Sequence, residues 1–325
     1  MVKLRNSRER KENSLKKYVL KRILYMLITL LVIATATFFL MHSLPGTPFD
    51  EEKMRLLTAD QRQQVYAKYG MDQPLLIQYF MYLGNIFKGD FGTSFIYTGQ
   101  SVQQIIATRI GPSALIGLQA VLLGLAIGLV LGIIAAYKHN SGIDFFTMVL
   151  SVLGISVPNF VVAAILQYQF GMKWGLFPVA YWESYASSVL PSLALSFGVI
   201  AIIARFMRTE VLDVLQQDYI LMAKSKGLSP FKILMMHTIR NSIIPVVTLL
   251  GPIVVNLLTG SLAVENIYSI PGIGSLFVDS IKSNDYTTIL GLTLFYSAFY
   301  VVTILIVDLL YCVIDPRIRL SPEKE

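Results

Sequence analysis

Charged residues are scarce in this sequence. Asp, Glu, Lys and Arg make up 14% of its 325 residues, and hydrophobic residues make up 54%. A water-soluble domain carries about 25% charged residues. A chain of this size therefore has too few charged side chains to cover a globule in water, and we expect lipid to cover much of its surface.

Metal ligands and disulfide partners are also few. The only cysteine, Cys312, lies inside an apolar run, and one thiol builds neither a disulfide framework nor a thiolate metal site. The three histidines are His42, His139 and His237, and no two of them have the spacing of a metal site on one helix. The sequence therefore predicts no metal site and no cofactor bound by this chain.

ATP-binding and catalytic patterns are missing as well. The nearest approach to a phosphate-binding loop runs from Gly84 to Gly89, but the next residue is Asp90, whose carboxylate would repel a phosphate. One carboxylate, Asp308, lies deep in an apolar run, whereas an intramembrane aspartyl protease needs two. We therefore expect no enzyme and no ATP hydrolysis by this chain. We interpret Asp308 either as a packing partner for Arg or Lys or as a functional group within the membrane.

Six long apolar runs are the main feature that the sequence does contain. The first follows Lys21 and Arg22, and its 22 uncharged residues exceed the apolar core of a cleaved signal peptide and can span the hydrocarbon layer as a helix. The fourth ends at Arg205 and Arg208, whose long side chains we expect to reach the membrane interface. The runs are Ile23–Leu44, Ser113–Tyr137, Phe145–Phe170, Val189–Ala204, Ile243–Val264 and Thr288–Ile314. We predict an all-α integral membrane protein with six transmembrane helices.

The distribution of Lys and Arg predicts which side of the membrane each loop faces. With the N-terminus in the cytoplasm, the cytoplasmic segments contain 19 of the 27 basic residues and the external segments contain 8. Cytoplasmic loops are enriched in Lys and Arg, so we place both termini in the cytoplasm. The net charge of +7 is thus a signal of topology and gives no support to nucleic-acid binding.

The runs divide the chain into five parts. We expect a basic cytoplasmic tail at 1–17, a first transmembrane helix at 18–44, an external helical region at 45–110, a five-helix core at 111–320 and a C-terminal tail at 321–325. Two capping-box patterns, at Thr58 with Gln61 and at Ser101 with Gln104, predict helices that begin within the external region.

Glycines recur at every fourth position of the second run, at Gly124, Gly128 and Gly132. They lie on one face of a helix and predict the close approach of another helix. That helix belongs either to this chain or to another subunit, and we favour this chain.

Four polar residues lie inside the apolar runs, where an unpartnered polar group is costly. They are Gln119, Asn159, Gln167 and Asn256. They either line an aqueous translocation path or form hydrogen bonds between helices. We choose Asn159, Gln167 and Asn256 as candidates for the path, and we favour Asn159 because it follows Pro158, where the helix has freed backbone groups.

A long cytoplasmic segment at 205–240 separates the fourth and fifth runs, whereas helices in a bundle are joined by about 2–8 residues. We predict one helix over 208–225, ended by Gly227 in the left-handed conformation. A second helix then begins with Ser229 as its N-cap and Pro230 at its first position. A helical hairpin of this kind, which covers 208–240, suits contact with a soluble partner that pushes on it.

Several segments of this hairpin match a known cytoplasmic loop. They are Asp218-Tyr219, Ala223-Lys224-Ser225-Lys226-Gly227-Leu228, His237, Arg240-Asn241 and Pro245-Val246-Val247-Thr248. On these residues the chain resembles the binding-protein-dependent ABC permeases in their oligopeptide and dipeptide form. The general pattern of the family is Glu-Ala-Ala, three residues and Gly. It is matched here only at Ala223 and Gly227, because Leu221 and Met222 occupy its first two positions.

Further segments extend the resemblance from about Tyr18 to Leu320. They are His42-Ser43-Leu44-Pro45-Gly46-Thr47-Pro48, Tyr69-Gly70-Met71-Asp72-Gln73-Pro74-Leu75, Gly89-Asp90-Phe91-Gly92-Thr93-Ser94, Gly154-Ile155-Ser156-Val157-Pro158, Glu265-Asn266-Ile267-Tyr268, Pro271-Gly272-Ile273-Gly274 and Asp315-Pro316-Arg317. Together they resemble most the first of the two membrane subunits of an oligopeptide importer.

The resemblance implies a type I ABC importer permease in the cell membrane of a prokaryote. The implied system takes up oligopeptides from an external peptide-binding protein, through this chain and a second homologous permease, and two cytoplasmic ATPase subunits use ATP and Mg. The residues implied for coupling to the ATPases are Asp218, Tyr219, Ala223, Lys224, Gly227 and His237.

Two alternatives stay open at this point. Related permeases carry dipeptides or nickel. A self-contained secondary transporter is a different class, which the sequence disfavours because it has no internal repeat and a single carboxylate deep in a run.

Overall fold

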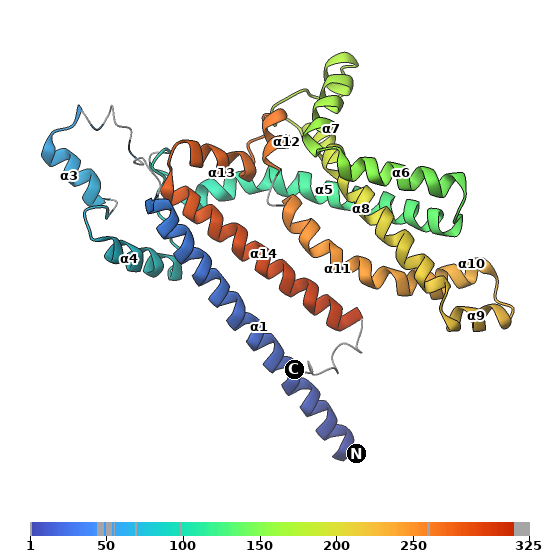
Figure 1. The fold of residues 1–325 in the computed structure, drawn as a ribbon. Helices are drawn as coiled ribbons and strands as arrows, with labels where there is room; N and C mark the ends of the chain where they lie inside the picture. The colour runs from blue at the N-terminus through green and yellow to red at the C-terminus, as the bar shows by residue number, and fades with distance from the viewer. Residues whose placement is uncertain are drawn as a thin grey trace. The chain divides into compact units, whose positions relative to one another are not determined.

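Helices form nearly all of the regular structure in the computed structural model, which describes residues 2–43, 49, 54, 56–68, 70–97, 99–258 and 261–314 (Figure 1). Within these ranges the only β-type pairing is an isolated bridge between Thr93 and Ser101. The elements are α1 (Val2–Ser43), α3 (Ala59–Lys68), α4 (Leu75–Phe87), α5 (Val102–Tyr137), α6 (Gly142–Ser156), α7 (Asn159–Leu166), η1 (Gln167–Lys173), η2 (Tyr185–Ser188), α8 (Val189–Leu215), α9 (Asp218–Ser225), α10 (Pro230–Ile233), η3 (Leu234–Thr238), α11 (Ile239–Leu258), α12 (Leu262–Ile267), α13 (Ile273–Lys282) and α14 (Tyr286–Ile314).

In the part of the chain that the structure describes, five stretches of helix are long and apolar enough to cross a membrane, and a sixth is present if one bent pair counts as a single span. The bent pair is α6 with the helix formed by α7 and η1, and the two parts meet at 99°. The bend falls at Pro158, which has no N–H to donate and disfavours helical geometry at Val157, and Val157 is extended. The predicted class, an all-α membrane protein with six spans, is confirmed.

The chain divides into two compact units. The first unit comprises Met1–Ile106 and Asp279–Leu305, and the second unit comprises Ala107–Val278 and Ile306–Glu325. Each unit has its own buried contacts, so each is described by itself.

A buried carboxylate organises the first unit. Asp285 is fully buried and accepts hydrogen bonds from the Ser94 hydroxyl, from the Phe95 N–H at 3.1 Å and from the Thr288 hydroxyl at 2.8 Å. Asp285 thus acts as the cap of α14 and holds the loop at 93–97 against the start of that helix. The two predicted capping boxes of this unit are also confirmed by reciprocal bonds at Thr58 with Gln61 and at Ser101 with Gln104.

The second unit is built around α8, which has more buried side chains than its neighbours and packs against α5, α6, α7 and α11. The glycines of α5 lie directly against it. A Cβ atom added at Gly128 would lie 2.8 Å from the Cβ of Ile203, and one added at Gly132 would lie 2.6 Å from the carbonyl oxygen of Ala204. The predicted close approach of a helix is therefore confirmed, and the helix belongs to this chain.

Some expectations fall outside the described residues. They concern 45–48 and 315–317, the C-terminal tail at 321–325, the side chains of the basic tail at 1–17, and the side chains of Asp308 and Cys312.

We predict that Gly128→Leu destabilises the subunit by about 1–3 kcal/mol, the usual cost of forcing extra atoms into a packed interface. Gly111→Leu is the matched control, because Gly111 lies in the same helix and has no heavy atom within 4 Å of an added Cβ. Thermal unfolding of the purified protein in detergent, followed by circular dichroism, measures both. Equal midpoints for the two variants would contradict the close packing of α5 on α8.

Candidate coupling site

The hairpin, which we expect to lie in the cytoplasm, is made of three helical pieces that follow α8. The expected single helix over 208–225 is wrong, because α8 ends at Leu215 and a new helix, α9, begins at Asp218. Gln217 between them is extended, with a ψ of 147°. The chain therefore changes direction at residues 216–217, and α9 is not a continuation of the membrane helix.

The turn between α9 and α10 has the predicted geometry. Gly227 has a φ of +77°, in the left-handed region that favours glycine. The Ser229 hydroxyl accepts a hydrogen bond from the Lys232 N–H at 3.3 Å, and Pro230 is the first residue of α10. The helix end at Gly227 and the new start at Ser229 are both confirmed.

The hairpin has a small hydrophobic core of its own. Ile220, Ala223 and Ile233 are buried together, with Leu228 packed partly against them. Ala223 therefore lies between α9 and α10, where its small side chain lets the two helices meet. Among the other residues that the resemblance implies for coupling, His237 is half-buried, and Asp218, Tyr219, Lys224 and Gly227 are exposed.

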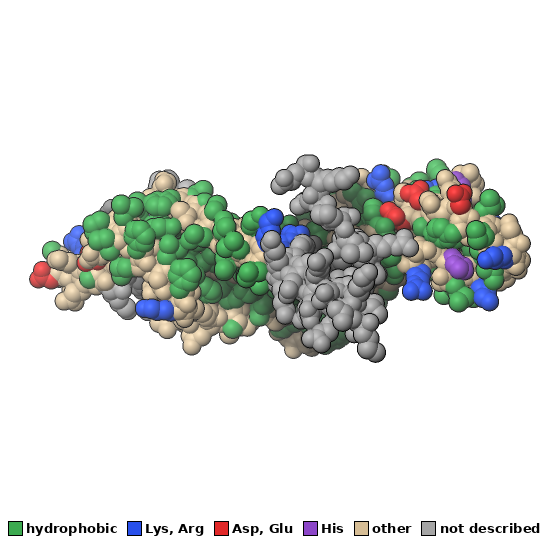
Figure 2. Space-filling model, turned by 90° about the horizontal axis from the view of Figure 1, so that it is seen from below, with side chains coloured by type: hydrophobic (Ala, Val, Ile, Leu, Met, Phe, Trp, Pro, Cys, Tyr) green, Lys and Arg blue, Asp and Glu red, His purple; other side chains and the backbone are tan. Residues whose placement is uncertain are grey.

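The outer surface of the hairpin is unusually apolar. Its exposed large hydrophobic residues are Tyr219, Leu221, Met222, Phe231, Met235 and Met236. Figure 2 shows Lys, Arg, Asp, Glu and His side chains beside hydrophobic ones over the part of the second unit that carries α9 and α10. A mixed patch of this kind on a helical projection is typical of a protein–protein contact. Leu221 and Met222, which depart from the general family pattern, lie on this surface and not in the core.

Hydrogen bonds join the hairpin to α11, and α11 in turn to α8. The Asn241 side-chain amide donates to the Tyr219 hydroxyl at 3.2 Å and to the His237 carbonyl at 2.7 Å, which joins α9 to η3 and α11. The Ser242 hydroxyl donates to the Glu210 carbonyl at 3.2 Å, which joins α11 to α8. These bonds thus link α9 to α11 and, through α11, to α8.

An ion pair that sequence reasoning missed ties α8 to α6. Arg208 forms two hydrogen bonds to the buried carboxylate of Asp144, from Nε at 2.5 Å and from the guanidinium NH2 group at 2.8 Å. His139 Nδ1 lies 3.2 Å from the same carboxylate, and the Asn140 N–H donates to it at 3.0 Å. The expectation that the Arg208 side chain reaches the membrane interface stays a prediction, because this ion pair does not test it. Asp144 lies in the first turn of α6, where acidic residues are common. Its position in the sequence therefore gives no sign of this pairing.

The candidate path residues lie in different surroundings. The Gln167 side-chain amide donates to the carbonyl oxygens of Val179 and Ile267, both at 2.8 Å, and the bond to Ile267 joins η1 to α12. Gln119 likewise accepts from the Ser192 hydroxyl at 2.7 Å. Asn159 is half-buried at the start of α7, and Asn256 is exposed on α11. The contacts of Gln119 and Gln167 favour packing for these two, and a path role for Asn159, Gln167 and Asn256 stays a prediction.

The bundle and its hairpin define the class of the protein as an all-helical, multi-span integral membrane protein with a helical projection between two of its spans. Comparison with known proteins then gives the family. Residues 128–320 match the binding-protein-dependent transport system inner membrane component, and residues 15–110 match the N-terminal part of the same kind of component. The chain belongs to this family.

Individual relatives match over nearly their whole length. The dipeptide transport system permease proteins DppB of Lactococcus lactis and Bacillus subtilis are each 45% identical, over 94% of this chain and 99% and 98% of theirs. The oligopeptide transport system permease protein OppB of Haemophilus influenzae is 39% identical, over 93% of this chain and 99% of its own.

Family membership confirms several expectations from the sequence. The chain is a transport component of the cell membrane and not an enzyme, because permeases of this family have no ATPase site and bind no cofactor of their own. Membership of this family also implies, in general terms, that the chain works with a binding protein, a partner permease and ATPases.

We predict that Arg208→Gln destabilises the protein by about 3 kcal/mol or more, because it leaves the buried Asp144 carboxylate without its charged partner. Arg205→Gln, on an exposed arginine of the same helix, is the matched control and is expected to have little effect. The double variant Asp144→Asn with Arg208→Gln removes both charges and is expected to regain part of the loss. Thermal unfolding of the four proteins is the measurement, and an Arg208→Gln midpoint equal to that of Arg205→Gln would contradict this role.

Proposed function

We propose that this chain is one of two permease subunits of an ATP-driven importer of short peptides. The observation that carries this proposal is the near-complete match to permeases named for peptide transport, at 45% identity for dipeptide systems and 38–39% for oligopeptide systems. Dipeptides are the favoured substrates on these identities. Oligopeptides, which the sequence segments first suggested, stay the second candidate.

The proposed partners follow from the same assignment. A second, homologous permease would complete the membrane path, and an external binding protein would deliver the peptide. Two ATPase subunits would bind the cytoplasmic hairpin, for which its exposed apolar residues on α9 and α10 offer a surface. Because the sequence contains no phosphate-binding loop, ATP binding and hydrolysis would occur in the ATPase subunits and would act on this chain by moving the hairpin.

The proposed mechanism is alternating access driven by movement of the hairpin. The core of Ile220, Ala223 and Ile233 makes α9 and α10 move together. The bonds of Asn241 and Ser242 pass this movement to α8 and α11 at once. Because Arg208 joins α8 to α6, the broken span at Pro158 moves with them. The path would open outward when the ATPases close on ATP, and inward after hydrolysis.

We predict that Gly227→Val abolishes most peptide uptake while the subunit still accumulates in the membrane. No heavy atom lies within 4 Å of a Cβ added at Gly227, so the cost within this chain is backbone strain of about 1–2 kcal/mol at a left-handed position. The larger effect is a changed docking surface for the ATPase.

Gly175→Val is the matched control, because Gly175 also has a positive φ, of 62°, and open space around it, but lies outside the hairpin. Uptake of labelled peptide and membrane abundance are measured for both variants. Equal uptake by the two at equal abundance would mean that the turn is a passive connection.

Substrate length is tested by uptake in cells that lack this chain and are complemented with it. We expect complementation to restore uptake of labelled Ala-Ala, with weaker competition from unlabelled penta-alanine and no restored uptake of nickel ions. Stronger competition by penta-alanine would transfer the assignment to oligopeptides. Restored nickel uptake without peptide uptake would refute the peptide assignment altogether.

A further inference from the structure

The helix α4, within the first unit, is short and apolar. Its 13 residues, Leu75–Phe87, contain no charged side chain, and charges occur only beyond its ends, at Asp72 and Lys88. At 1.5 Å per residue the helix is about 20 Å long, which is too short to cross a hydrocarbon layer of about 30 Å. In a membrane protein, an apolar helix of this length is a buried core helix, an interfacial helix or a re-entrant one.

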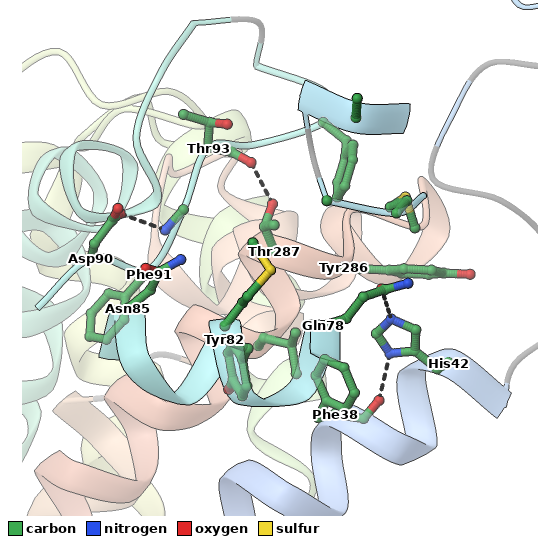
Figure 3. A pocket seen from close by; sticks show the side chains of 17 residues that line it. Phe38, His42, Gln78, Tyr82, Asn85, Asp90, Phe91, Thr93, Tyr286 and Thr287 are labelled. Carbon is green, nitrogen blue, oxygen red and sulfur yellow. Dashed lines mark hydrogen bonds between the residues drawn. The ribbon is translucent and has the colours of Figure 1, made fainter. Parts of the chain in front are cut away.

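The inner face of α4 carries its polar side chains. Gln78, Tyr82 and Asn85 line a pocket of about 280 Å³ that α4 shares with α1 and α14. Figure 3 shows Gln78 and Tyr82 beside Phe38 and His42 of α1. The Phe38 and Tyr82 rings are stacked with their centroids 5.4 Å apart, and His42 Nε2 lies 3.3 Å from Gln78 Oε1. The polar side of this helix therefore faces other parts of the chain.

The outer face of α4 is apolar and exposed. Leu76, Phe80 and Phe87 lie on one side of the helix and are 62%, 67% and 83% exposed. Ile77 and Gly84 lie on the same side and are also exposed. The described part of the chain leaves this face uncovered, and the face carries no polar side chain. A helix that borders water has the opposite arrangement, with its apolar residues inside and its polar residues outside.

Contacts with α1 indicate the depth of α4 in the membrane. The Tyr79 and Thr35 hydroxyls lie 2.8 Å apart, and the Tyr79 and Phe39 rings contact each other with 5.4 Å between their centroids. Thr35 precedes the end of the first span, Leu20–Ser43, by eight residues, which is about 12 Å along a helix. Figure 1 shows α4 beside the same end of α1. The helix therefore lies beside the last turns of the span, at the depth of the hydrocarbon, and not beyond its end.

The composition of the outer face favours lipid over a protein partner. Interfaces between soluble proteins carry about one hydrogen bond per 100–200 Å², and this face offers no side-chain donor or acceptor. Contacts between membrane helices are enriched in small residues, whereas Leu76, Phe80 and Phe87 are large. The outer face also continues the apolar surface of the first span, on which Val32 and Leu40 are exposed.

We propose that the outer face of α4, centred on Phe80, binds the acyl chains of the lipid leaflet at the external end of the first span. The helix is then an interfacial one, which lies beside α1 without crossing the membrane, and Lys88 at its end can reach the lipid headgroups. The region between the first two spans is thus anchored in lipid, with the pocket on its protein side. This binding does not depend on which substrate the transporter carries.

Photo-crosslinking to lipid tests the proposal on the wild-type protein. The intact transporter is reconstituted in nanodiscs that contain a phospholipid with a diazirine in its acyl chain, irradiated and digested with trypsin. Cleavage after Lys and Arg releases α4 in peptide 69–88, the first span in 23–53 and part of α3 in 63–68. We expect lipid adducts on 23–53 and 69–88 and none on 63–68, because α3 is polar.

A spin label then compares lipid with water at the outer face. In a Cys312→Ser background, a nitroxide is attached to a single cysteine at Phe80, at Val32 in the middle of the first span or at the exposed Gln63 of α3. Oxygen concentrates in hydrocarbon, whereas a polar nickel chelate stays in water. We expect the ratio of oxygen to chelate collisions at Phe80 to be at least about fivefold above that at Gln63 and to approach that at Val32, because an apolar medium disfavours polar solutes.

Each of three results overturns the proposal. The first is a peptide 69–88 without lipid adducts when 23–53 carries them, a result that needs no variant to fold. The second is a label at Phe80 that neither oxygen nor the chelate reaches, which would show that a protein subunit covers the outer face. The third is a label at Phe80 as accessible to the chelate as the one at Gln63, which would place α4 in water. Loss of that accessibility on addition of the binding protein would make the outer face a protein-docking surface.

Discussion

The close packing of α8 against its neighbours is the constraint on which the second unit depends. Glycines at every fourth position of α5 bring its backbone against α8, and Gly154 of α6 meets the same helix at Ala201. Without side chains at these points, the helices approach more closely than ordinary apolar packing allows, and dispersion contacts are strongest at short range. Since α8 leads directly into the cytoplasmic hairpin, the same packing decides where the hairpin emerges from the membrane.

Polar connections link this packed helix to the membrane helices around it. The Arg208–Asp144 pair holds α8 to the broken third span. The Asn241 bond holds the hairpin to α11, and the Ser242 bond holds α11 to α8. Each polar group here is paired, as a low-dielectric surrounding requires. The hairpin, with its own hydrophobic core, is therefore linked to three membrane helices and not suspended from one. This arrangement suits a subunit that receives its energy from a separate ATPase.

Local signals in the sequence predicted much of this structure, and long-range ones did not. Apolar runs located the spans, the glycine spacing indicated the face of α5 that another helix approaches, and Gly227 with Ser229 located the turn, because each of these signals lies in neighbouring residues. The identity of that helix as α8 came from the structure. The break at Gln216 and Gln217 was missed, since glutamine is a good helix former and no Gly or Pro marks the site. The pairing of Arg208 with Asp144 spans 64 positions and needs the folded bundle to bring the two together.

The proposed coupling depends on an ATPase that binds the outer surface of α9 and α10. A photo-crosslinking amino acid placed at Phe231 in the intact transporter tests it, with Phe145 of α6 as the control, because both side chains are highly exposed, at 70% and 74%. If the ATPase binds this surface, we expect an adduct with the ATPase subunit from position 231 and none from position 145. Absence of an adduct at position 231, or equal adducts from both positions, would contradict it.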